Sequence, residues 1–163
     1  MTFTDFIPLT LYLALALGFS FLCSILEAVL LSVGPGYIQS MIDNGSKAGE
    51  RLQRLKNDLD KSLSAVLTLN TIAHTMGAAG VGSEVSTLFD GKYLGWASAI
   101  LTLLVLVLSE VIPKTLGARY CNALAKPTAM LIQWLIWALF PFVWMLQICS
   151  CLLYTSDAAD EGL

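Results

Sequence analysis

Polar side chains recur at helical spacing inside long apolar stretches of this sequence. In the first stretch Ser20, Ser24 and Glu27 stand at positions i, i+4 and i+7, so a helix would place them along one stripe. In the second stretch Asn70 and His74 are four residues apart and form another stripe. Hydroxyl, amide and carboxylate oxygens are ligands that hard cations prefer. Both stripes therefore carry candidate ligands for a cation.

A third apolar stretch contains a carboxylate next to a proline. Pro113 has no amide hydrogen and clashes with the carbonyl four residues earlier, which belongs to Ser109. A helix here would therefore free a backbone oxygen beside Glu110. A charged side chain at the centre of a bilayer costs at least ~2.5 to 3.5 kcal/mol, so Glu110 is expected to have a function. Together the oxygen donors predict a site for magnesium or sodium rather than for zinc or copper.

Each of these residues also has a structural interpretation. Ser20 or Ser64 alone more often bonds to its own helix or mediates helix packing. His74 is more often a hydrogen-bonding packing residue than a metal ligand. Glu27 could pair with Lys114 or reach the membrane interface. Glu110 is the residue that these interpretations explain least.

The composition indicates a membrane protein. Of 163 residues, 56% are hydrophobic and only 13% are charged, whereas soluble domains carry about a quarter charged residues. Residues 6–33 contain one charge, residues 94–113 contain one, and residues 127–153 contain none. Such runs are long enough to cross a hydrocarbon core, which takes about 20 residues. We expect an all-α integral membrane protein.

The apolar stretches predict three transmembrane helices, over residues 6–33, 63–89 and 94–117. Residues 37–61 hold five of the nine basic residues and have leucines at helical spacing, which predicts amphipathic juxtamembrane helices. The fourth hydrophobic segment, 127–153, contains Gln133, Pro141 and three tryptophans. It fits a span and a broken, re-entrant or interfacial hairpin equally well.

The distribution of charge suggests the orientation and excludes some functions. Basic residues prefer the cytoplasmic side, which puts 37–61 and 114–126 inside and the N-terminus outside a cell membrane. Acidic and basic residues balance over 1–153, so no nucleic-acid partner is expected. No nucleophile, base and orienting group occur together, so we expect no enzyme. Residues 149–163 lack periodicity and are interpreted as a non-native or disordered tail after a domain of residues 1–148.

Three motifs resemble the transmembrane domain of the CNNM/CorC magnesium transporters. They are Phe19-Ser20-Phe21-Leu22-Cys23-Ser24-Ile25-Leu26-Glu27-Ala28, Leu69-Asn70-Thr71-Ile72-Ala73-His74-Thr75 and Ser109-Glu110-Val111-Ile112-Pro113-Lys114-Thr115-Leu116. The third motif is the most specific, and the resemblance covers residues 8–148. This chain departs from the family where Ile25 and Leu26 follow Ser24, and where His74 replaces a second asparagine.

The resemblance implies a homodimer in the lipid bilayer with three spanning helices and a juxtamembrane helical belt, so it favours a fourth segment that does not span. It implies that Ser24, Asn70 and Glu110 bind dehydrated Mg²⁺ as the transported substrate, with Ser64 and Ser20 as weaker candidates. It further implies magnesium efflux driven by Na⁺, and nucleotide binding only through cytosolic CBS domains outside this sequence.

A different class of function also fits the polar stripes. They could hold together a membrane-embedded regulatory or scaffold subunit that dimerises and transports no ion. In that case Glu110 would pair with Lys114 or with a neighbouring helix.

Overall fold

The computed structural model describes residues 6–89, 91–145 and 148, and the regular elements in these ranges are helical. This agrees with the predicted all-α class. The helices are α1 (Ile7–Ser32), α2 (Pro35–Asp43), α3 (Lys47–Asn57), α4 (Leu59–Phe89), α5 (Leu94–Leu104), the π-helix η2 (Val105–Val111), α6 (Ile112–Arg119) and α7 (Cys121–Ala138).

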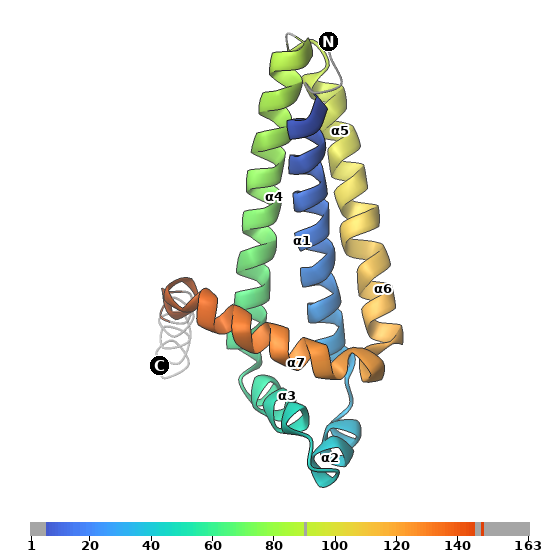
Figure 1. The fold of residues 1–163 in the computed structure, drawn as a ribbon, viewed down its shortest axis with the longest axis vertical. Coiled ribbons are helices and arrows are strands. Elements are labelled where there is room, and N and C mark those ends of the chain that lie inside the picture. Colours follow the sequence, from blue (N-terminus) through green and yellow to red (C-terminus); the bar gives the residue numbers. More distant parts are fainter. Residues whose placement is uncertain (1–5, 90, 146–147, 149–163) are drawn as a thin grey trace, which may run out of the picture.

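Three long helical columns run side by side (Figure 1). The central column is α1, with α4 on one side and the continuous α5–η2–α6 column on the other. Ile7–Ser32 and Leu94–Arg119 are each long and apolar enough to cross a membrane. With 31 residues, α4 is about 46 Å long at 1.5 Å per residue. Its serines, glycines, Asn70 and His74 make it more polar than the other two columns.

The juxtamembrane stretch predicted over 37–61 forms two short helices, α2 and α3, separated at Gly45, which has a left-handed φ of 72°. Two of the other predicted boundaries need correction. The second column begins at Leu59 instead of residue 63, directly after α3. The fourth segment begins at Cys121 instead of residue 127, and Pro127 lies inside α7, six residues after its first residue.

The helix α7 crosses the lower ends of the three columns instead of running alongside them (Figure 1). Its inner face is buried and includes Ala125, Ala129 and Ile132. Trp134 and Trp137 on its outer face are 62% and 76% exposed. Exposed tryptophans are typical of membrane interfaces. The arrangement therefore favours the alternative in which the fourth hydrophobic segment does not span the membrane. The tail predicted over 149–163 lies outside the described residues.

The hydrophobic core lies where these short helices meet the columns. Leu30 of α1, Leu52 of α3 and Ile132 of α7 are fully buried in one cluster. The Lys56 ammonium donates to the Val33 carbonyl, which ends the last turn of α1. A cation in this position also interacts favourably with the helix dipole. The lower end is therefore a packed base, and the upper columns depend mainly on contacts with one another.

Small residues let α1 and α4 approach closely. A Cβ atom added at Gly77 would collide with the Ala16 methyl group, and one added at Gly80 would lie 2.5 Å from the Tyr12 ring. Small residues at such crossings allow helices in a membrane to pack tightly. This contact positions the polar stripes on the two helices.

Gly77→Ala should therefore destabilise the protein, by about 1 to 3 kcal/mol, because overpacking forces the helices apart. Gly18→Ala makes the same change on α1 at a position with no neighbour within 4 Å. We expect this control to be neutral or slightly stabilising, since alanine favours helix. Thermal unfolding of both variants in detergent compares them, and equal melting temperatures would contradict the close packing.

Candidate cation site

Two contacts define how α1 and α4 are aligned. The Ser20 Oγ lies 2.5 Å from the His74 Nε2, and Ala16 faces Gly77. The helices run in opposite directions (Figure 1). One turn further along α1 is Ser24, and one turn back along α4 is Asn70. These two candidate ligands therefore lie at the same level.

Ser24 and Asn70 also share an unusual property. Their Oγ and Oδ1 atoms are buried and have no hydrogen-bond partner within the described part of the chain. A buried polar group without a partner costs about 1 to 3 kcal/mol. Two such oxygens on facing helices indicate a binding site for a ligand that contacts both of them. A cation is such a ligand, because it accepts electron pairs from both oxygens.

The proline motif in the third column changes the helical register. Residues 105–111 form a π-helix, whose last turn joins the Ile112 N–H to the Val107 carbonyl. The next residue is Pro113, which has no N–H to continue either pattern. The predicted interruption at Pro113 is therefore a widened turn within a continuous column. Such π-turns are frequent at functional sites.

Glu110 lies in this widened segment and lines a cleft of about 290 Å³ with His74 and Ala78 of α4 and Ala16 of α1. The height of Glu110 along α1 can be read from its neighbour Ser109, whose hydroxyl donates a hydrogen bond to the Leu17 carbonyl at 3.4 Å. Leu17 precedes Ser24 by seven residues of α1, so Glu110 lies roughly 9 Å above Ser24 and Asn70 along the column axis. The structure thus places Glu110 near the level of His74, and Ser24 and Asn70 are not among the residues that line its cleft.

The two weaker candidates lie in different surroundings. Ser20 is fully buried, and its hydroxyl is engaged with His74. Ser64 is half-buried and precedes Asn70 by six residues, about 9 Å along α4. Ser20 therefore borders the site, and Ser64 lies below it.

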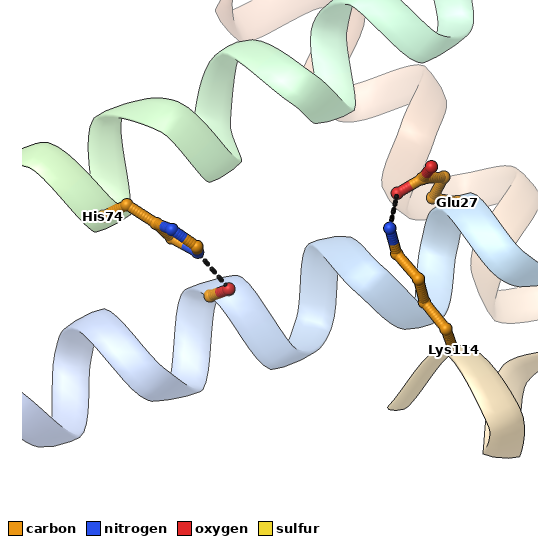
Figure 2. A network of polar contacts seen from close by, with 4 residues as sticks. Glu27, His74 and Lys114 are labelled. Atoms are coloured by element: carbon orange, nitrogen blue, oxygen red, sulfur yellow. Dashed lines mark hydrogen bonds and ion pairs between the residues drawn. The ribbon is translucent and has the colours of Figure 1, made fainter. Parts of the chain in front are cut away.

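The sequence also pointed to the Glu27–Lys114 pair, and the structure contains it. The Lys114 Nζ lies 3.3 Å from the Glu27 Oε2. Figure 2 shows Lys114 reaching from α6 to Glu27 on α1, and His74 reaching from α4 to another point on α1. The bond between Ser20 and His74 was not specifically predicted, although their polarity on neighbouring apolar helices was the available signal.

The donor set restricts the kind of cation. Across residues 6–89, 91–145 and 148, no three His, Cys, Asp or Glu side chains cluster so that they could hold a metal. A nitrogen- and sulfur-rich site of the kind that zinc prefers is therefore absent from these residues. One carboxylate with neutral oxygens fits a hard cation that retains some of its water.

Comparison with known proteins gives consistent matches. The family model described as the cyclin M transmembrane N-terminal domain (CNNM) matches residues 11–158. A UPF0053 protein of Synechocystis sp., sll1254, is 30% identical over 126 residues, which cover 77% of this chain and 36% of that protein. The UPF0053 inner membrane protein YfjD of Escherichia coli is 29% identical over 122 residues, 74% of this chain and 28% of YfjD.

A UPF0053 protein of Haemophilus influenzae is 26% identical over 147 residues, 88% of this chain and 35% of that protein. The chain thus spans about a third of the length of the curated relatives it matches. The match to the family model continues to residue 158, beyond the domain boundary predicted at residue 148.

The two buried serines of α1 allow a matched test. Ser20→Ala should lower the thermal stability by about 1 kcal/mol, because it removes the partner of His74. Ser24→Ala should leave the stability unchanged or raise it by about 1 kcal/mol without divalent cations, because it removes an unpaired buried hydroxyl. Thermal unfolding in a chelating buffer measures both, and equal losses would show that the Ser24 hydroxyl does have a partner.

Proposed function

Because the chain belongs to the CNNM (cyclin M) family of transmembrane domains, we propose that it transports magnesium ions across a cell membrane. The observation that carries this proposal is the pair of unpartnered oxygens on Ser24 and Asn70. They lie at one level between two helices, and Glu110 is roughly 9 Å above them along the column axis. No other buried side-chain oxygens in the described residues lack a partner.

In the proposed site the ion is held by the Ser24 hydroxyl, the Asn70 amide oxygen and the Glu110 carboxylate. Ser20 and Ser64 are weaker candidates at its borders. Magnesium releases its water reluctantly and requires near-octahedral oxygen geometry. A carboxylate compensates the ion's charge, and the prearranged neutral oxygens replace part of its water. The remaining positions are taken by water in the cleft beside Glu110.

The three ligands come from the three columns, and this links binding to movement. Ser24 is on α1, Asn70 on α4 and Glu110 on η2. Bringing Glu110 to the level of the other two ligands requires a shift of its side chain or of the widened π-turn. The ion therefore favours one arrangement of the columns, and its release favours another. Such a change alternates access between the two sides of the membrane.

The proposed membrane placement uses all three columns as spans. The N-terminus is outside, and α2, α3 and α7 form a belt at the cytoplasmic surface, where the basic residues of α3 lie. The outer column exposes large apolar side chains: Trp96, Ile100, Leu103, Leu106, Val111 and Leu116. In water this surface would be unfavourable. In the proposed arrangement it contacts lipid and a second copy of the chain.

We propose efflux coupled to sodium entry. Moving a divalent ion outward against 100 mV costs about 4.6 kcal/mol, since each elementary charge costs ~2.3 kcal/mol. Two sodium ions entering down the same potential release the same amount, and their concentration gradient adds to it.

Glu110→Gln should abolish magnesium flux from loaded proteoliposomes, because the site loses its only negative charge. Glu84→Gln is the matched control, because it neutralises another carboxylate in the same columns that is outside the proposed site. Fluorescent magnesium indicators follow the flux, and the control should transport like the parent chain. Unchanged flux in Glu110→Gln would remove the carboxylate from the mechanism.

Calorimetry tests the alternative of a scaffold subunit. Millimolar or tighter magnesium binding that Ser24→Ala and Asn70→Ala abolish supports transport. Absence of binding to the parent chain would favour a subunit that dimerises and carries no ion.

A further inference from the structure

One lysine lies within reach of two carboxylates. Lys114 pairs with Glu27 across the contact between α6 and α1, at 3.3 Å (Figure 2). It also follows Glu110 by four residues in the same column. Residues four apart on a helix are neighbours on its surface.

The direction of the side chain favours contact with Glu110 as well. Side chains on a helix lean toward its N-terminus, and for Lys114 that is the direction of Glu110. The two positions are about 6 Å apart along the column axis. A lysine has a flexible four-carbon stem that spans this distance. Lys114 can therefore reach Glu27 in one side-chain conformation and Glu110 in another.

The two carboxylates differ in how well they tolerate the loss of a partner. The Glu27 side chain is 33% exposed near the end of α1, so polar surroundings can replace the ammonium. Glu110 lies in a cleft between apolar helices, where an uncompensated charge is costly. Glu110 therefore needs a positive charge nearby, and Lys114 is the cationic residue placed to supply it when no metal ion does.

We propose that Lys114 is a tethered cation that alternates between Glu27 and Glu110 and competes with the metal ion for Glu110. This inference rests on the proposed function. Its new element is the role of the ion pair: Glu27 holds the lysine away while Glu110 binds the ion, and the lysine returns to Glu110 as the ion leaves. In the structure Lys114 forms its ion pair with Glu27.

A double-mutant cycle tests the competition, with magnesium affinity measured by calorimetry on the chain in lipid nanodiscs. Lys114→Gln should raise the affinity, and Glu27→Gln should lower it by releasing the lysine to Glu110, each by about tenfold given charges at this separation. The magnesium affinity of the double variant should equal that of Lys114→Gln within about twofold, because Glu27 affects the affinity only through its ion pair with Lys114. Lys126→Gln, which removes an exposed lysine of α7, is the control and should bind like the parent chain.

Other roles of the pair predict different results. A purely structural pair predicts equal losses of affinity in both single variants. Electrostatic effects acting only through space predict additive changes, with the double variant close to the parent chain. Either result would overturn the competition.

Glu27→Asp provides a charge-conserving test if Glu27→Gln does not fold. Its shorter side chain draws the carboxylate away from Lys114, so affinity should fall although the charge is unchanged. An unchanged affinity would contradict the proposal. If the parent chain binds magnesium, Glu110→Gln does not, and the cycle is additive, only this inference fails. If the parent chain does not bind magnesium, the proposed function fails with it.

Discussion

The contact between Ala16 and Gly77 brings α1 and α4 close enough for their polar residues to face each other. With helices of fixed rise, one such contact determines which residues are level further along. It places Ser20 against His74, and one turn below it places Ser24 opposite Asn70. A bulkier residue at position 77 would separate both pairs. The site is therefore a consequence of helix packing as much as of the ligands themselves.

The Ser20–His74 pair and the Ser24–Asn70 pair differ in whether their buried polar atoms have hydrogen-bond partners. Ser20 and His74 satisfy each other, so this level holds the helices together without any ligand. Ser24 and Asn70 retain free oxygens at the cost of some stability. Real proteins accept such costs mainly at functional sites. A stabilising pair next to a destabilising pair is the arrangement expected of a binding site that must keep its shape between ions.

Much of this could be predicted from sequence. Long charge-poor runs predicted the columns, and helical spacing predicted polar stripes that contain Ser24 and Asn70. Glu110 was singled out by the cost of a carboxylate in an apolar run, close to Pro113. The i, i+4 pattern could not give the register between helices, because this depends on the collision at Gly77, which involves residues 61 positions apart. The π-turn could not be predicted either, since Pro113 indicates that the helix is interrupted but not whether it ends, kinks or widens there. The path of α7 depends on its packing across the columns.

Glu110 lies in the widened turn at 105–111, and the ion pair between Lys114 and Glu27 lies about one turn below it. A π-turn has one residue more than an α-turn, so its return to α-geometry rotates everything that follows by about 100°. Lys114 lies just after this transition and Glu110 just within it. A small change of register between them would alter both the level of the carboxylate and the reach of the lysine. In the proposed mechanism, the movement of Glu110 toward Ser24 and Asn70 and the choice of partner by Lys114 would be two results of one local change in the helix. This change would link ion binding to the contact between α6 and α1.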